Sequence, residues 1–399
     1  MPSERLYYDD AYTTRFTARV AGRGAFGGRP AVELESTFFY PESGGQEADR
    51  GTLGRLSVVD VQADPEERVW HVLEGDAPAD QELEAQVDWA RRFDHMQQHT
   101  GQHILSAAFE REAGAPTLSS RLGTERCTIE VGMAEADWKR VARLEEAANR
   151  IVWEDRPVER HWADERSVAR FRLRKAPVVT GRIRVVEIPD WDVSACGGTH
   201  TRRTGEVGLI KIVRWEKVRG NLRFEFLCGG RAHRDYAWRT EELQEAARRR
   251  TLGERELIAH LERAAAERDT LRRQLDDLGR RVIAAEARER VGRPPRGVAD
   301  LAEARPHEEL RRFALQCLEA GAPWVVAAAR APEPALVLGR AREGGADLRA
   351  LLPELLERAR GKGGGSPDLL QVRAADPAGA EAAFTWASDA VPAAVEGAR

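Results

Sequence analysis

The sequence has few cysteines, few lysines and no long hydrophobic run. The four cysteines are Cys127, Cys196, Cys228 and Cys317. Their spacing is not that of a disulfide framework, which excludes a small disulfide-stapled secreted scaffold and favours a reducing compartment. No apolar stretch approaches the roughly 20 residues of a membrane-spanning helix. The N-terminus also lacks the apolar segment of a secretory signal. We therefore predict a cytoplasmic protein with no membrane partner.

The sequence also has no large excess of positive or negative charge. Lysine occurs at only five positions, so arginine supplies nearly all of the positive charge. Because 62 basic residues face 66 acidic ones, the net charge is only −4. A chain so nearly neutral gives no whole-molecule sign of nucleic-acid binding, and any such surface must be local. The length of 399 residues, 42% of them hydrophobic, is sufficient for two or three domains with real cores.

Hydrophobic periodicity changes along the chain. Residues 1–90 alternate apolar and polar positions between glycine-rich turns, which predicts a small antiparallel β-barrel. Residues 91–237 mix helical and strand patterns. Residues 238–292 carry leucines at steps of four and three, typical of a coiled coil. Residues 293–399 alternate strands and helices. We therefore predict an α+β multidomain protein with a β-barrel, an α/β domain, a helical coiled-coil arm and a small α/β C-terminal domain.

Two pairs of metal-ligand residues stand out in the α/β domain. His99 and His103 are four residues apart in a segment that reads as helix, so both imidazoles lie on one face. Cys196 and His200 flank a Gly-Gly turn. Three nitrogens and one sulfur are a donor set that suits tetrahedral zinc. If all four bind, the site is structural; if one is loose, water or substrate can enter.

Other features favour hydrolysis and phosphate contact. The segment Thr117–Gly123 is rich in hydroxyls, and the histidine pair lacks the glutamate of a zinc peptidase. A metal-dependent hydrolase of activated esters fits this set. Residues 166–184 hold seven positive charges, among them Arg172, Arg174 and Lys175, and no acid, which favours a phosphate-contacting surface. A glycine-dense segment at 361–367, with Lys362, reads as a loop that contacts an anion or backbone.

Four ordered motifs together resemble a known family. They are Phe38-Phe-Tyr-Pro-Glu-Ser-Gly-Gly-Gln46, His99-Thr-Gly-Gln-His103, Cys196-Gly-Gly-Thr-His200 and Lys362-Gly-Gly-Gly-Ser-Pro-Asp368. They resemble the editing domain of alanyl-tRNA synthetases, its preceding barrel and the DHH-associated C-terminal domain. The short stretch before residue 38 has no room for an aminoacylation domain. The chain is thus most similar to the long form of the free-standing AlaX editing proteins.

The resemblance implies a function and a set of site residues. The expected activity is hydrolysis of the ester in Ser-tRNA(Ala) or Gly-tRNA(Ala), sparing Ala-tRNA(Ala), with Zn²⁺ as cofactor. The expected ligands are the two pairs already described, His99, His103, Cys196 and His200. Thr117 and Gln46 are the expected catalytic residues. Thr117 would recognise the serine hydroxyl, and Gln46, with Gly44 and Gly45, would face the acceptor end. The C-terminal region would contact the tRNA body and can pair two subunits as a homodimer.

Two other classes of function use the same residues. In a tRNA-binding module the zinc would be structural and no hydrolysis would occur. A metallo-hydrolase of small aminoacyl esters would have no use for the excess of basic residues from Arg166 to Arg223 or for the C-terminal arm. Activity on charged tRNA separates all three.

Overall fold

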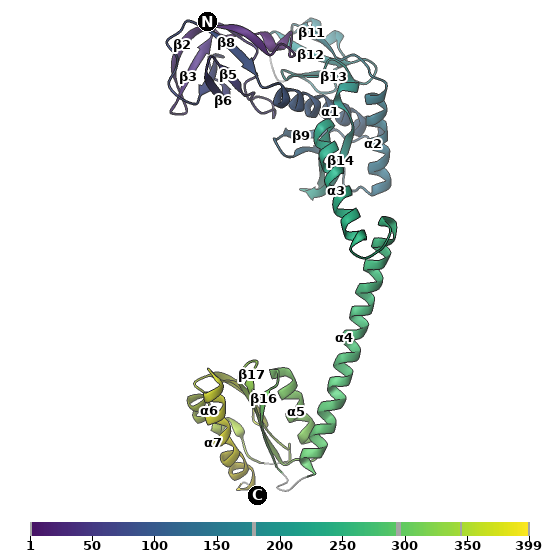
Figure 1. The fold of residues 1–399 in the computed structure, drawn as a ribbon. Helices are drawn as coiled ribbons and strands as arrows, with labels where there is room; N and C mark the ends of the chain where they lie inside the picture. The colour runs from purple at the N-terminus through teal and green to yellow at the C-terminus, as the bar shows by residue number, and fades with distance from the viewer. Residues whose placement is uncertain (1, 178–180, 293–296, 344, 398–399) are drawn as a thin grey trace. The chain divides into compact units, whose positions relative to one another are not determined.

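The chain forms two compact α+β units, Met1–Arg249 and Arg250–Arg399 (Figure 1). The computed structural model describes residues 2–177, 181–292, 297–343 and 345–397. The α+β class predicted from the sequence is confirmed, while the finer domain boundaries at 90, 237 and 292 stay predictions. In the part of the chain that is described, no helix is both long and apolar enough to cross a membrane.

The first unit begins with the predicted antiparallel barrel. Six strands close it in the order β2-β3-β7-β6-β5-β8. Their bounds are β2 Arg15–Phe26, β3 Arg29–Leu34, β5 Gly51–Leu53, β6 Leu56–Ala63, β7 Val69–Leu73 and β8 Glu82–Val87. The predicted alternation of buried and exposed residues is present in β8, where every second residue is buried. A short parallel pair, β1 (Glu4–Arg5) and β4 (Ser36–Thr37), lies beside it.

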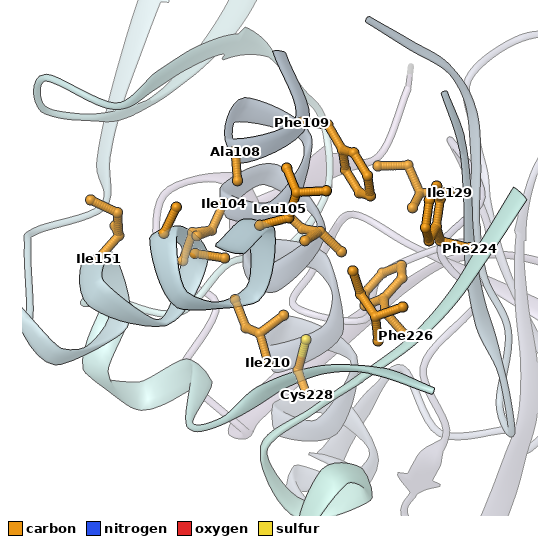
Figure 2. Close-up of a cluster of buried hydrophobic side chains, with 14 of the residues drawn as sticks. Ile104, Leu105, Ala108, Phe109, Ile129, Ile151, Ile210, Phe224, Phe226 and Cys228 are labelled. Atoms are coloured by element: carbon orange, nitrogen blue, oxygen red, sulfur yellow. The ribbon is translucent and has the colours of Figure 1, made fainter. Parts of the chain in front are cut away.

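The helix α1 (Trp89–Ala113) follows the barrel and forms the centre of the unit. Asp88 caps its N-terminus by accepting from the Arg91 amide, and Gly114 ends it in the left-handed conformation. The helix packs on α2 (Trp138–Trp153) and on a four-stranded sheet. The strands of this sheet, in order, are β14 Ile210–Val218, β15 Asn221–Cys228, β10 Cys127–Val131 and β9 Thr117–Leu122. Figure 2 shows the shared core, in which the rings of Phe109 and Phe224 lie 4.7 Å apart.

A smaller antiparallel sheet completes the first unit. It has the order β11-β12-β13, with β11 at Glu159–Ala163, β12 at Ile183–Ile188 and β13 at Asp192–Ala195. The helix α3 (Gly229–Arg248) follows β15 and ends the unit.

One buried arginine joins α1 to the barrel. Arg92 is fully buried, and its Nε donates to both carboxylate oxygens of Asp49 at 3.1 and 3.0 Å. Its Nη1 donates to the carbonyl of Ala11 at 2.6 Å, and its Nη2 donates to the carbonyl of Phe38 and to Asp49. Asp49 in turn accepts from the Tyr40 amide. A charge this deep is tolerated because every donor has an acceptor.

The second unit begins with the long helix α4 (Glu254–Val291) and ends in an α/β layer. Its sheet has the order β16-β17-β18-β20-β19. The bounds are β16 Val298–Ala304, β17 Trp324–Ala331, β18 Ala335–Arg340, β19 Lys362–Ser366 and β20 Leu369–Arg373. The remaining helices are α5 His307–Glu319, α6 Leu352–Ala359 and α7 Pro377–Glu396. The heptad positions of α4 lie largely exposed in the single chain, for example Leu271 and Leu275.

The glycine-dense segment is a strand, so the prediction of a loop at 361–367 was wrong. β19 pairs antiparallel with β20. A Cβ at Gly363 or Gly365 would collide with the backbone of Gln371 or Leu369 on the partner strand. The glycines are there because the two backbones approach closely. Lys362 opens this edge strand with its side chain exposed.

The Arg92 pairing predicts a large effect on the stability of the first unit. Arg92→Ala leaves the Asp49 carboxylate buried without its partner, which costs about 3–5 kcal/mol. Amide hydrogen exchange in β2 and β6 measures the free energy of opening of the barrel. The matched control is Arg19→Ala, which removes an exposed pair with Glu82 and changes the same quantity by less than about 1 kcal/mol. Equal effects of the two variants would contradict the role given to Arg92.

Candidate metal centre

Four potential ligands that are distant in the sequence meet in the first unit. His99 and His103 lie on the inner face of α1, and Cys196 and His200 flank the turn that follows β13. All four donor atoms lie within 4.8 Å of one another. The Cys196 Sγ is 3.4 Å from His99 Nε2 and 3.3 Å from His200 Nε2. The sequence prediction that these residues form one cluster is therefore confirmed in the structure.

The spacing of the donors fits a tetrahedral ion. With a metal–sulfur bond of about 2.3 Å and a metal–nitrogen bond of about 2.0–2.1 Å, as for zinc, sulfur and nitrogen ligands lie roughly 3.5 Å apart. The two sulfur–nitrogen distances are close to this value. Sulfur and imidazole together also favour zinc-like ions over calcium or magnesium, which take oxygen ligands. The four residues can thus hold a metal ion.

Each of the three imidazole rings is fixed through its Nδ1. His99 Nδ1 lies 2.7 Å from Gln46 Oε1, His103 Nδ1 lies 2.9 Å from Asp192 Oδ2, and His200 Nδ1 lies 3.2 Å from Thr100 Oγ1. A hydrogen bond at Nδ1 leaves Nε2 as the nitrogen that points into the cluster. This arrangement of outer partners is the one found around protein-bound metal ions.

Close packing around the Gly-Gly turn brings barrel and turn together. Gln46 is fully buried, and its Oε1 also accepts from the Thr199 amide while its Nε2 donates to the Thr199 hydroxyl. A Cβ at Gly198 would collide with the His99 ring and approach Gln46 Oε1 to 2.9 Å. Glycine is required at 198 because any side chain would push the turn away from α1.

The electrostatics of the cluster favour a bound cation. Burial alone would raise the pKa of the Cys196 thiol, but the neighbouring His99 and His200 rings hold it well below its usual value. Burial and the nearby His99 hold the pKa of His200 well below its usual value. Cysteine binds metals as the thiolate and histidine as the neutral ring. The two lowered pKa values therefore favour the protonation states in which Cys196 and His200 can bind a metal ion.

His103 behaves differently because of its carboxylate partner. Burial lowers the pKa of His103, but hydrogen bonds to Asp192 and Cys196 outweigh it and raise the pKa to about 9. A bound ion would compete with the proton at this ring. Asp192 is itself held by Arg174, whose Nε donates to Oδ1 at 2.6 Å.

The basic residues predicted to contact phosphate do not share one environment. Arg174 is bound to Asp192 and Ser194, so it supports the cluster from behind. The side chains of Arg172 and Lys175 are exposed. Lys362 belongs to the second unit. Of this set, Arg174 is therefore already engaged by protein groups.

The glycine motif of the barrel contacts the strand β9. The backbone carbonyl of Gly45 accepts from the Leu122 amide at 2.9 Å, and Gln46 forms a parallel bridge with Leu122. Gly44 and Gly45 both have positive φ, and Gly44 is exposed. This turn therefore fixes the position of Gln46 opposite His99.

Thr117 lies at the start of β9 and is linked to α1 by hydroxyls. Its Oγ1 donates to Ser106 Oγ at 2.9 Å, and Gln102 Nε2 donates to the same Ser106 oxygen at 2.6 Å. Gln102 immediately precedes the ligand candidate His103. Thr117 is half-buried, and the proton of its hydroxyl is engaged by Ser106.

Three supporting residues were not found from the sequence. Asp192, Thr100 and Thr199 orient the rings or the turn. Thr100 and Thr199 lie inside the two ligand motifs, but their spacing does not show which groups they contact, and nothing in its local sequence marks Asp192 as a partner. Asp192 is 89 residues from His103, and only strand pairing of β12 with β13 places it there. For Thr100, adjacency to His99 on a buried helix face was the one available signal.

Asp192 provides a test of the outer partners. Asp192→Asn removes one of the two acceptors that hold His103 and Arg174, so we expect metal affinity to fall about 10- to 100-fold. Competition with a chelator measures this affinity. The matched control is Asp190→Asn, the same chemical change at an exposed turn position two residues away. If Asp192→Asn bound the metal as tightly as the native protein, the hydrogen bond between Asp192 and His103 would have no part in metal binding.

Comparison with known proteins identifies relatives of this chain. Residues 183–224 match the family model described as the threonyl and alanyl tRNA synthetase second additional domain. The alanyl-tRNA editing protein AlaX-L of Pyrococcus horikoshii is 38% identical over 239 residues, covering 57% of this chain and 59% of that protein. The alanine–tRNA ligase of Methanopyrus kandleri is 37% identical over 255 residues, covering 60% of this chain and 28% of the ligase.

A third relative extends further along the chain. The alanine–tRNA ligase of Archaeoglobus fulgidus is 31% identical over 390 residues, covering 92% of this chain and 42% of the ligase. The chain thus matches less than two thirds of the length of each of these relatives. The resemblance expected from the four motifs is confirmed: the chain is a relative of the AlaX-L alanyl-tRNA editing protein and of the alanine–tRNA ligases, and contains their synthetase additional domain.

Proposed function

We propose that this protein is a zinc-dependent trans-editing deacylase that hydrolyses the ester of Ser-tRNA(Ala) or Gly-tRNA(Ala). The observation that carries the proposal is the largely buried cluster of three imidazoles and one cysteine sulfur in a chain that resembles AlaX-L. The cluster has one open edge, because Gly197 is exposed and Cys196 is half-buried. Buried ligands with an exposed residue beside them suit a small aminoacyl group attached to a large carrier.

The side chains around the cluster have distinct roles in this proposal. His99, His103, Cys196 and His200 hold the zinc ion. When bound, zinc supplies Lewis acidity to the ester or to water. Gln46 has no solvent exposure and its amide is occupied by His99 and Thr199, so we assign it to positioning the ligand ring rather than to touching substrate. Asp192 positions the His103 ring in the same way.

Thr117 is the candidate for recognising serine. Its hydroxyl donates to Ser106, which also accepts from Gln102, and its remaining acceptor lone pairs can take a hydrogen bond from the hydroxyl of a seryl group. An alanyl group offers only a methyl, which would displace water from the acceptor lone pairs of that hydroxyl without replacing the hydrogen bond, at a cost of about 1–3 kcal/mol. Glycine is smaller than either and is not rejected by size.

The proposed partner is tRNA(Ala). In this proposal the exposed Arg172 and Lys175 of the basic segment contact phosphates near the first unit, and Gly44 faces the acceptor end. The second unit, with Lys362, contacts the tRNA body. The exposed apolar positions of α4 allow two subunits to pair through the C-terminal region.

Deacylation assays test the activity directly. The purified protein is expected to release serine or glycine from tRNA(Ala) and to spare Ala-tRNA(Ala). Cys196→Ala is expected to lose both zinc and activity, since three ligands hold the ion less tightly. Zinc content by mass spectrometry accompanies each assay. Binding of tRNA and zinc without hydrolysis would instead support a binding module, and hydrolysis of small aminoacyl esters alone would support an orphan metallo-hydrolase.

Specificity provides a second test. Thr117→Val preserves the shape of the side chain but removes its hydroxyl, so kcat/KM for Ser-tRNA(Ala) is expected to fall about tenfold while that for Gly-tRNA(Ala) changes little. Ser119→Ala removes an exposed hydroxyl two residues further along β9 and should leave both values unchanged. A parallel loss for both substrates in Thr117→Val would show that the hydroxyl serves the fold, not serine recognition.

A further inference from the structure

Aromatic rings and arginines gather beside the open edge of the metal centre. Tyr8 is the side chain nearest to the exposed Gly197, with its hydroxyl 3.5 Å from where a Cβ would stand. The Tyr8 ring meets Trp162 of β11 edge to face, with ring centroids 5.6 Å apart. The Arg182 guanidinium lies over Trp162 at 3.9 Å. We call Tyr8, Trp162 and Arg182 the aromatic–arginine surface.

This surface is exposed rather than part of a core. Trp162 is 37% exposed, although an indole of this size is normally covered when it serves only packing. Its Nε1 donates to Asp9 at 3.3 Å, which fixes the ring plane. Arg182 is exposed, and among the described residues no carboxylate pairs with it. A fixed aromatic face next to a free guanidinium is a combination that binds the bases and phosphates of single-stranded nucleic acid.

Two further arginines, the buried Arg184 and the partly buried Arg160, add positive charge under the same surface. Arg184 is paired with Trp162 across the β11–β12 ladder, and its Nη1 donates to the carbonyls of Cys196 and Gly198 at 2.9 Å each. Its Nη2 has no hydrogen-bond partner among the described residues. Arg160, two residues before Trp162 and so on the same sheet face, donates from Nη2 to the His200 carbonyl at 3.3 Å and also has an unpaired Nε among those residues.

A second arginine stacks on an aromatic ring just after the ligand His200. Arg202 lies 3.9 Å over the Tyr12 ring, and Tyr12 in turn contacts Trp89. The acidic groups facing this region are each engaged: Asp9 by Trp162, Asp10 by Arg202 and Glu206 by Tyr12. Of these three, only Asp10 is paired with a cation, because an indole or a phenol leaves the negative charge of Asp9 and Glu206 in place. Arg160, Arg182 and Arg184 still outnumber these two carboxylates, so the local charge is positive.

We propose that the aromatic–arginine surface binds the unpaired nucleotides at the 3′ end of the tRNA, with a base stacked on the Arg182 guanidinium that lies over Trp162 and the adjoining phosphate attracted by its charge. This inference rests on the proposed editing function, because it explains how the aminoacyl end reaches the cluster. The surface starts at the open edge of the metal centre and leads away from it. The stacking needs no particular base, so the surface positions the substrate while the aminoacyl pocket selects it.

The test couples a protein change to an RNA change. Binding of uncharged tRNA(Ala), and of the same tRNA lacking its unpaired 3′ nucleotides, is measured by fluorescence anisotropy at one fixed salt concentration. Trp162→Ala is expected to weaken binding of intact tRNA about tenfold and to have little effect on the shortened tRNA. Trp162→Phe should restore most of the affinity. The control Trp153→Ala removes a 70% exposed tryptophan of α2 and should change neither Kd.

Arg182→Gln gives a second variant that avoids any effect of Trp162 on folding. Because Arg182 is exposed, the variant should keep its zinc content, weaken binding of intact tRNA and reduce the salt dependence of binding. In deacylation, both variants should raise KM and leave kcat unchanged.

The outcomes separate this surface from the editing function. Normal deacylation together with unchanged Kd and KM in Trp162→Ala and Arg182→Gln would overturn the surface but leave editing intact. Equal weakening for intact and shortened tRNA would also overturn it, since the change would then act elsewhere. If the native protein fails to deacylate but Trp162 still couples to the 3′ end, the surface stands and the editing proposal falls.

Discussion

The structure depends on the hydrogen bond at the Nδ1 of each clustered histidine. These bonds come from different parts of the first unit: Gln46 from the barrel, Asp192 from the small sheet and Thr100 from α1 itself. Each ring can direct its Nε2 inward only while its partner is in place. The barrel and the small sheet are thus parts of the metal centre, and an isolated α1 would carry two histidines without a fixed common target.

Two buried arginines hold the parts of the first unit together, so that these hydrogen bonds can form. Arg92 holds α1 against the barrel through Asp49 and two carbonyls, and Arg184 holds the Cys196 turn through the carbonyls on either side of Gly197. Arginine suits both tasks because its planar group donates in several directions at once and stays charged when buried. Part of the arginine excess over lysine therefore serves the interior, which whole-chain composition could not reveal.

Two different kinds of side chain lie around the metal centre: hydroxyls on one side, and aromatic rings with arginine on another. The hydroxyls of Ser106 and Thr117 lie on the side of α1 and β9, where they suit a small polar side chain. Tyr8 and the stacked Trp162 and Arg182 lie at the open edge beside Gly197. A substrate with a small acyl group and a polyanionic carrier requires both kinds of surface, because selectivity resides in the first and affinity in the second.

Local pattern was sufficient for the barrel, the helix α1 and the four ligand candidates, because alternation, helical spacing and the Cys-Gly-Gly-Thr-His turn are encoded by adjacent residues. It failed for β19, whose glycines reflect the close approach of β20 rather than a flexible loop. The assignment of Arg174 to phosphate contact stays a prediction, and local pattern gave no sign of the bond from this side chain to Asp192. Asp192, Arg184 and the stack on Trp162 were decided only by tertiary structure, since strand pairing brings together residues whose separation in the chain carries no signal.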